Sequence, residues 1–341
     1  MAEPTKPAAG KMGPADLMNM GMSYMTARVL AAGVQLNVFS HLAAGHQTAA
    51  AVAQAANSSE RGMRMLLDAL AGLELLTKRG EQYQLTPASA KYLVRESPEY
   101  MGAVLEDDSL WEAWNKIVEV VRTGKPVRRV EERSKAEQFF PILIRSLHVL
   151  NREPARLAAQ ALGAGHTRQG LQVLDVACGS GVWGIGVAEA DPAATVTFQD
   201  FPGVLEHTRT YAQRHGLEKR SAYLPGDLKK VDLGTERFYV ALLGNIVHSE
   251  GEASTRDLFR RLHQALKPNG QVAIVDMIPN DQRTGPPYAL IFALNMLVNT
   301  EFGDTYTLAE YRAWLTEAGF ARVETADIQS HSPLIVGIKD R

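Results

Sequence analysis

The second half of the chain alternates between short apolar runs and longer amphipathic stretches. The apolar runs have the length of buried strands, and the stretches between them repeat apolar residues at helical spacing. This alternation predicts a mostly parallel sheet covered by helices on both faces. The last two runs have no helix between them, so we expect an antiparallel hairpin at the sheet edge. The expected strands cover 171–177, 194–201, 221–227, 238–248, 271–278, 321–328 and 332–340.

The first hundred residues follow a different pattern. Three helical stretches come first, and Gly33 is the expected break in the longest of them. Ser59 is a candidate N-cap for the third stretch. An alternating segment with a turn at Arg79 and Gly80 follows, which predicts a two-stranded wing. This order of elements is typical of a winged helix.

A winged helix raises the question of DNA binding. The third helical stretch carries Arg61 and Arg64 but also several acids. The formal net charge is −2 and no long basic run occurs, so a nucleic-acid or membrane-surface partner is not favoured. We therefore expect a packing and dimerisation module with adaptable methionines at its start. These methionines are Met12, Met18, Met20, Met22 and Met25.

The residues between these two parts have helical patterns. We expect one helix over 111–126 that ends at Gly124, and another over 136–162 that bends at Pro141 or Pro154. The expected division of the chain is a disordered tail at 1–14, a winged-helix-like domain at 15–100, a helical, pocket-lining linker at 101–165 and a sheet domain at 166–341.

The remaining composition narrows the class of protein. The single cysteine, Cys178, excludes an internal disulfide and a cysteine metal cluster. No histidine and carboxylate set has a convincing metal-ligand spacing, so we expect no metal. No apolar run approaches the roughly 20 residues that span a bilayer, and the first fifteen residues lack the apolar core of a signal peptide. We expect a cytoplasmic protein.

The first expected strand runs into a glycine-rich string, ACGSGVWG. Gly179, Gly181 and Gly184 allow the backbone to approach a ligand closely before a helix begins. Asp200 follows the next strand, where a carboxylate can accept hydrogen bonds from ribose hydroxyls. This spacing matches the dinucleotide fingerprint. By itself it fits a nicotinamide dinucleotide and S-adenosylmethionine equally, because both contain that ribose.

Three features favour S-adenosylmethionine. Asp175 lies inside the strand before the glycines and needs a polar partner: the cofactor's ammonium group, directly or through water, the glycine loop, or both together. Gly226, Asp227 and Leu228 close the third strand, where an acid followed by an apolar residue can meet an adenine ring. The sheet also ends in a hairpin instead of a further parallel unit.

In combination, these motifs resemble the small-molecule O-methyltransferases related to plant caffeate and animal acetylserotonin enzymes, whose bacterial members make antibiotics and pigments. The resemblance covers nearly the whole chain. It implies an α/β, Rossmann-like class I methyltransferase fold, a winged-helix dimerisation domain, an obligate homodimer and methyl transfer to a hydroxyl of a small aromatic metabolite. The strings that carry it are VLDVACGSG, FQDFPGV, PGDL, IVH, LKPNG and EYRAWLTEAGF.

The resemblance also implies residue roles. His248 matches the family's catalytic histidine, and a histidine can take the proton of a phenol at neutral pH. Asp200, before Phe201, matches the ribose-binding acid, and Asp227 with Leu228 matches the pair that contacts adenine. The expected cofactor residues are Asp175, Gly179, Gly181, Asp200, Phe201, Gly226, Asp227, Leu228 and Asn245.

The chain departs from the family pattern around the histidine. Ser249 follows it where the family has an acid, and Thr305 stands where a family carboxylate orients it. Asp276, after the fifth strand, is a candidate orienter, and Glu252 falls at a later acid position. These departures are also compatible with a C- or N-methyltransferase that works mainly by proximity.

Aromatic and amide side chains on the helices predict a pocket on which an aromatic acceptor can stack. Two other interpretations stay open. The glycine spacing allows an NAD(P)-dependent oxidoreductase, and the wing allows a non-catalytic regulator. The expected pocket residues are Trp111, Trp114, Phe140, His148, Phe292, Asn295, Met296 and Asn299.

Overall fold

The computed structural model describes residues 12–106, 108–129 and 133–340, with side chains from residue 143 onward in the last range. Its contacts divide the chain into two compact units, Met1–Asp108 and Ser109–Arg341. The helices at 109–161, which the sequence suggests as part of a linker, belong to the second unit.

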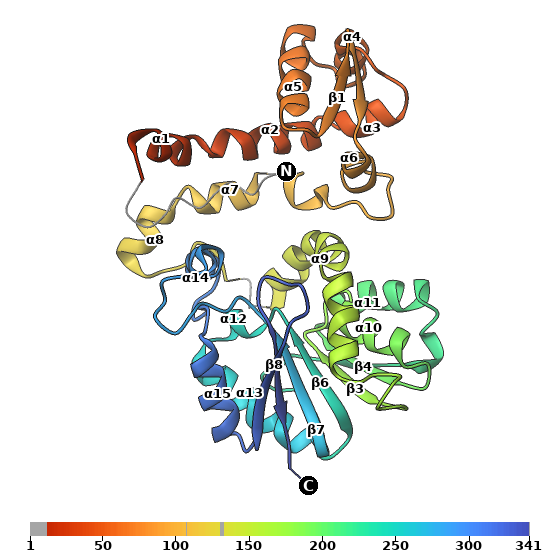
Figure 1. The fold of residues 1–341 in the computed structure, drawn as a ribbon, viewed down its shortest axis with the longest axis vertical. Helices are drawn as coiled ribbons and strands as arrows, with labels where there is room; N and C mark the ends of the chain where they lie inside the picture. The colour runs from red at the N-terminus through yellow and green to blue at the C-terminus, as the bar shows by residue number, and fades with distance from the viewer. Residues whose placement is uncertain (1–11, 107, 130–132, 341) are drawn as a thin grey trace. The chain divides into compact units, whose positions relative to one another are not determined.

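The first unit consists of helices and a two-stranded wing (Figure 1). Ser59 caps α5 as expected, because its side chain accepts the N–H of Gly62. The wing forms where the alternating segment predicts it, and Tyr83 on its second strand is buried. The elements are α1 Pro14–Met22, α2 Tyr24–Gln35, α3 Val38–Ala43, α4 Ala49–Ala55, α5 Glu60–Gly72, β1 Leu76–Arg79, β2 Gln82–Leu85, α6 Pro87–Tyr92 and η1 Gly102–Leu105.

The expected helix break at Gly33 is wrong. Gly33 is buried inside α2, where a Cβ would come within 3.2 Å of Leu70 and Phe39. It therefore allows close packing between helices. The breaks fall at Ser23 and at Asn37, which has a left-handed φ of 54°.

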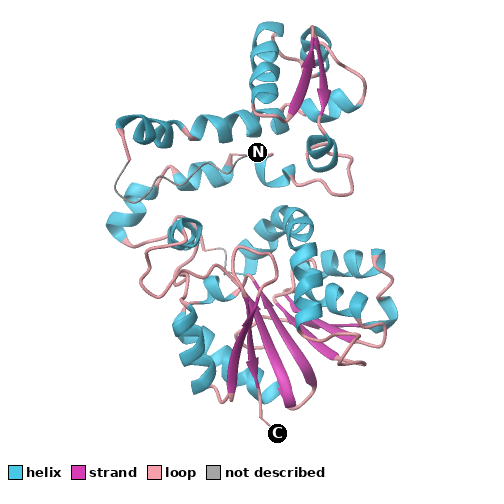
Figure 2. Ribbon diagram, viewed as in Figure 1, coloured by secondary structure: helices cyan, strands magenta, loops and turns pink. Residues whose placement is uncertain are grey.

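The second unit contains a seven-stranded sheet in the order β5-β4-β3-β6-β7-β9-β8 (Figure 2). The first five of these strands are parallel, and β9 is antiparallel to both β7 and β8. The expected C-terminal hairpin is confirmed. The strands are β3 Gln172–Val176, β4 Thr195–Asp200, β5 Ser221–Pro225, β6 Phe238–Gly244, β7 Leu266–Val275, β8 Arg322–Ala326 and β9 Leu334–Ile338.

Helices cover both faces of this sheet. Alternate residues of β3 enter different cores: Val173 packs with α9, α10 and α11, whereas Leu174 packs with α13 and α15. The expected helix over 111–126 is interrupted and forms α7 and α8, and Gly124 ends α8 with a φ of 65°. The helices are α7 Ser109–Trp114, α8 Ile117–Thr123, α9 Arg133–Ala161, α10 Val182–Ala190, α11 Pro202–Arg214, η2 Glu218–Arg220, α12 Val247–Glu250, α13 Glu252–Ala265, α14 Pro287–Asn299 and α15 Leu308–Glu317.

The topology determines where a ligand can bind. The chain crosses from β3 to β4 on one face and from β6 to β7 on the other, so a crevice forms at the carboxyl ends of β3 and β6. Across 12–106, 108–129 and 133–340, we find no helix long and apolar enough to cross a membrane.

One acid is buried inside the central strand. The side chain of Asp175 is fully buried, and its Oδ2 accepts the N–H of Gly184 at 2.8 Å. Its Oδ1 has no hydrogen-bond partner. Burial therefore raises the pKa of Asp175 to about 8, although the Gly184 bond acts in the opposite direction.

This raised pKa predicts a pH-dependent stability. An unfolded aspartate titrates near pH 3.9, so between about pH 4 and pH 8 the native state binds more protons and the unfolding free energy falls as the pH rises. We expect Asp175→Asn to stabilise the protein at pH 8 and to have a much smaller effect at pH 5. Thermal unfolding at pH values from 5 to 8 measures this change in stability, and Asp232→Asn, at an exposed aspartate, is the control. A stability difference independent of pH would contradict the prediction.

Candidate active site

A cavity of about 670 Å³ lies at the carboxyl ends of the parallel strands of the second unit. Loops after β3, β4, β5 and β6 form one side of it. Helices α9 and α14 contribute side chains to the other, together with Trp114 of α7. The site therefore divides into a side built mainly from loops and a side built mainly from helices.

The glycine loop after β3 presents its backbone to the cavity. Gly179 has a φ of 55°, and a Cβ built on it would meet nothing nearer than Ile144 at 3.9 Å. Gly181 has a φ of 77° but faces the protein interior, where a Cβ would lie 2.7 Å from the ring of Phe198. Gly179 therefore faces the cavity, whereas Gly181 allows the helix to pack on β4; the expected ligand contact of Gly181 is not supported.

Asp200 ends β4 beside this loop and lines the cavity. Its Oδ2 accepts the N–H of Gly179 at 2.9 Å, and its Oδ1 accepts the N–H of Phe201 at 2.7 Å. Burial raises the pKa of this carboxyl group to about 6. Each oxygen keeps a further lone pair, so the carboxylate can accept hydrogen bonds from a pair of ribose hydroxyls.

The other loops extend this side of the site. Phe201, Gly226, Asp227, Leu228 and Asn245 all line the cavity. The open backbone at Gly179 and the oriented carboxylate of Asp200 fit a nucleoside, and the acid and apolar pair after β5 fits a base. The residues present thus match S-adenosylmethionine.

Asp175 does not line the cavity. Its bond to Gly184 makes it an anchor beneath the glycine loop. Of the two expected partners, the loop is the one found, and direct contact with a cofactor ammonium group is not supported.

His248, on the short helix α12, is paired with Asp276 at the end of β7. Nδ1 of His248 donates to Oδ1 of Asp276 at 2.5 Å, and the backbone N–H of His248 donates to Oδ2 at 3.0 Å. Both side chains line the cavity. Because Nδ1 is engaged, Nε2 is the ring nitrogen that can take a proton from a ligand.

The other acid expected near the histidine, Glu252, lies outside the cavity lining. Glu252 begins α13, is exposed and forms an ion pair with Arg256, so the structure does not support its expected catalytic role. Asp304 likewise pairs with Arg283 and not with the imidazole.

The helix side of the cavity is mostly apolar, with a polar row along α14. Trp114 Nε1–H donates to Asn295 Oδ1 at 2.9 Å, and Asn299 Nδ2–H donates to the same oxygen at 3.1 Å. Oδ1 of Asn299 is buried without a partner. The ring of Phe292 meets His248 edge-on, with centroids 4.9 Å apart, and Met296 also lines the cavity.

Two expected pocket residues, Trp111 and His148, do not line this cavity. Trp111 borders a shallow hollow outside the main cavity, and Phe140 lies outside the described side chains. His148 points behind the glycine loop, where its Nδ1 lies 3.1 Å from Oγ of Ser180 and its ring stacks on Tyr211. Burial, followed by the charge of His215, lowers the pKa of His148 to about 4.

Several residues that line the cavity were not predicted from the sequence. Trp183 and Asn151 line the cavity, as does Gln199, whose side chain bridges the first and third loops by accepting from Ala177 N–H and donating to the Gly226 carbonyl. Trp183 lies within the glycine-rich string ACGSGVWG and Gln199 directly precedes Asp200, so their place in or beside the motifs was the available signal. Among the described residues, no cluster of three or more potential metal ligands occurs.

Comparisons with known proteins agree with this geometry. Residues 151–321 match the model of the O-methyltransferase domain, and residues 18–95 match that of the O-methyltransferase dimerisation domain. The tetracenomycin polyketide synthesis 8-O-methyltransferase of Streptomyces glaucescens is 29% identical over 96% of this chain and 98% of its own. Acetylserotonin O-methyltransferase of Mus musculus is 30% identical over 90% of this chain and 84% of its own.

Solved structures show the same fold. A Nostoc punctiforme protein assigned as an O-methyltransferase has a TM-score of 0.83 and 32% identity, over 96% of this chain and 99% of that one. Human N-acetylserotonin methyltransferase in complex with S-adenosylmethionine has a TM-score of 0.84 and 24% identity, over 98% of this chain and all of that one. The chain thus belongs to the O-methyltransferase family, and it is an S-adenosylmethionine-dependent methyltransferase.

Proposed function

We propose that this chain methylates a hydroxyl group of a small, neutral aromatic acceptor, with His248 as the general base and Asp276 as its orienter. The observation that carries the proposal is the buried His248–Asp276 pair, which lines the same cavity as Asp200 and the glycine loop. An enzyme working by proximity alone has no need of such a pair.

The chemistry requires a base and alignment. S-adenosylmethionine supplies an electrophilic methyl group on a sulfonium. A neutral phenol becomes a good nucleophile only as its proton leaves, and Nε2 of His248 takes that proton. Asp276 stabilises the imidazolium that forms and keeps Nδ1 protonated. The walls contribute by holding the hydroxyl in line with the methyl carbon.

The side chains that line the cavity also favour a flat, uncharged acceptor. Phe292, Tyr288 and Trp114 offer aromatic surface on which a ring can stack. Among the described residues that line the cavity, Lys229 is the only lysine or arginine, and it is paired with Glu250 at 3.7 Å. Among these described lining residues, a carboxylate on the acceptor would therefore meet no unpaired lysine or arginine.

A homodimer is the second part of the proposal. The first unit matches a dimerisation domain, and its opening helices expose large apolar side chains. Arg64 on α5, a candidate for DNA contact, is instead paired with Asp68 at 2.9 Å. The exposed apolar residues are Met12, Leu17, Met18, Met20, Met22, Tyr24 and Met25.

The general-base role predicts a specific kinetic defect. We expect His248→Ala to lower turnover by about 10²- to 10⁴-fold while cofactor affinity measured by calorimetry stays unchanged. Asp276→Asn should lower turnover in the same direction, because the tautomer and orientation of the imidazole are lost. Exposed His207→Ala is the matched control. Full turnover by His248→Ala would refute the role.

The ribose contact predicts a pH-dependent affinity. The ionised form of Asp200 accepts the hydroxyl hydrogen bonds, so cofactor affinity should be constant above about pH 6 and decline as the pH falls through that value. Asp200→Asn should bind the cofactor more weakly and lose this dependence. Calorimetric titrations from pH 5 to pH 8 test it, with exposed Asp257→Asn as control. Equal affinity and equal pH dependence in Asp200→Asn would contradict the contact.

The acceptor class can be tested with the substrates of two relatives. A relative from Streptomyces sahachiroi is named for 3-hydroxy-5-methyl-1-naphthoate, which carries a carboxylate, and the Mus musculus relative is named for acetylserotonin, which does not. With labelled S-adenosylmethionine, we expect the neutral acceptor to be methylated faster. Faster methylation of the naphthoate would overturn the preference for a neutral acceptor and leave the general-base role intact.

A further inference from the structure

The backbone of His248 is held from two sides. Its N–H donates to Asp276 Oδ2, and its carbonyl accepts the N–H of Asp304 at 2.9 Å. Gly303 lies so close that a Cβ there would come 2.5 Å from the His248 carbonyl oxygen. The segment 303–305, which follows α14, therefore helps to fix the position of the imidazole.

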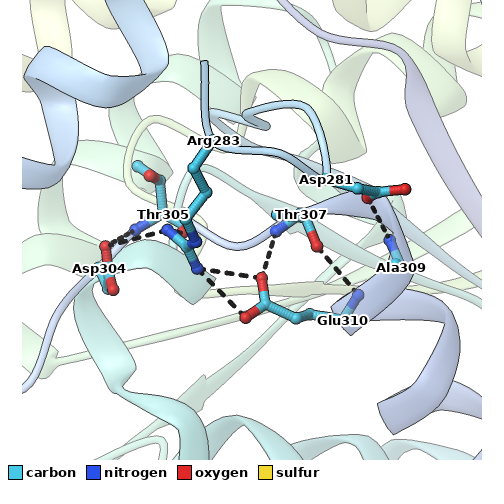
Figure 3. Close-up of polar contacts among 7 residues, drawn as sticks. All are labelled: Asp281, Arg283, Asp304, Thr305, Thr307, Ala309 and Glu310. Carbon is cyan, nitrogen blue, oxygen red and sulfur yellow. Dashed lines mark hydrogen bonds and ion pairs between the residues drawn. The ribbon is translucent and has the colours of Figure 1, made fainter. Parts of the chain in front are cut away.

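Arg283 holds this segment through polar contacts (Figure 3) and does not line the cavity. Its Nη1 donates to the carbonyl of Thr305 at 3.0 Å and lies 3.9 Å from Asp304 Oδ1. Its Nη2 donates to both carboxylate oxygens of Glu310 at 3.1 Å. Glu310 also accepts the N–H of Thr307 in the capping box of α15. One guanidinium thus compensates two carboxylates and anchors the segment to a helix start.

Asp276 lies at the end of β7, and the loop that follows it contains the turn with Arg283. Arg283 N–H donates to the Asn280 carbonyl at 2.8 Å, and Asn280 N–H donates to the Gly285 carbonyl at 2.7 Å. Arg283 has a φ of 51°, a left-handed conformation that non-glycine residues adopt only when their surroundings require it. This conformation directs the guanidinium toward 304–305.

We propose that Arg283 is a positioning residue for the catalytic histidine. It ties the loop after β7, which begins at Asp276, to the segment that holds the His248 carbonyl. Both sides of the His248–Asp276 pair are thereby kept in one arrangement. The inference rests on the proposed general-base role of His248, and Arg283 acts through 303–305 without touching cofactor or acceptor.

The test compares Arg283→Gln and Arg283→Lys with Arg322→Gln, a matched control at an exposed arginine that pairs with Glu324 on β8. Proton NMR of the free, full-length enzyme detects the downfield imidazole proton of the His248–Asp276 hydrogen bond, which His248→Ala and Asp276→Asn assign by its loss. We expect Arg283→Gln to shift or broaden this resonance. The control should retain it, and Arg283→Lys should perturb it less than Arg283→Gln because the charge is kept. This readout needs no acceptor.

Kinetics on acetylserotonin provides the second readout. We expect Arg283→Gln to lower kcat by about tenfold or more with unchanged affinity for S-adenosylmethionine, and Arg283→Lys, which keeps the charge but not the forked geometry, to recover part of the loss. An unaltered resonance in Arg283→Gln, or a loss of kcat matched by equal losses of cofactor affinity and thermal stability, would overturn the inference. Full turnover by His248→Ala would instead overturn the general base, so the two failures are distinguishable.

Discussion

The carboxylate of Asp276 connects the pieces of the candidate site. It accepts hydrogen bonds from the ring and the backbone of His248 and from the N–H of Met277. One side chain at the end of β7 thus orients the short helix after β6 and fixes the first residue of the loop that leads to α14. Burial makes this connection strong, because water does not compete for the carboxylate.

The sheet and the cofactor side could be predicted from the sequence because their signals are local. Alternating apolar runs located all seven strands of the sheet, and the missing helix before β9 predicted the antiparallel pair. The places of Asp200, Gly226 and Asp227 in the site could be predicted because each lies at the end of a strand. Parallel strands bring their carboxyl ends to one edge of the sheet. The position of His248 after β6 follows from the same rule.

The helix side was harder to predict because it depends on side-chain direction and on small interruptions. His148 and Leu147 are neighbours on α9, yet only Leu147 lines the cavity, since helix rotation turns the histidine toward Tyr211. Glu252 is close to His248 in sequence but begins a helix that leads away from the site. Asp175 shows a related limit: its buried position was predictable, but which of its two possible partners it contacts was not.

The two sides of the cavity are built from different chemical parts. The side proposed for the cofactor presents backbone groups at Gly179 and Gly226 and two acids, Asp200 and Asp227. The helix side, where we propose that the acceptor binds, presents exchangeable side chains along one face of α14, where Phe292, Asn295 and Asn299 are spaced at helical intervals. Under this proposal, point substitutions on that single face remodel the acceptor pocket and leave the loop side unchanged. An ancestral chain of this design could diversify its products while conserving its methyl donor.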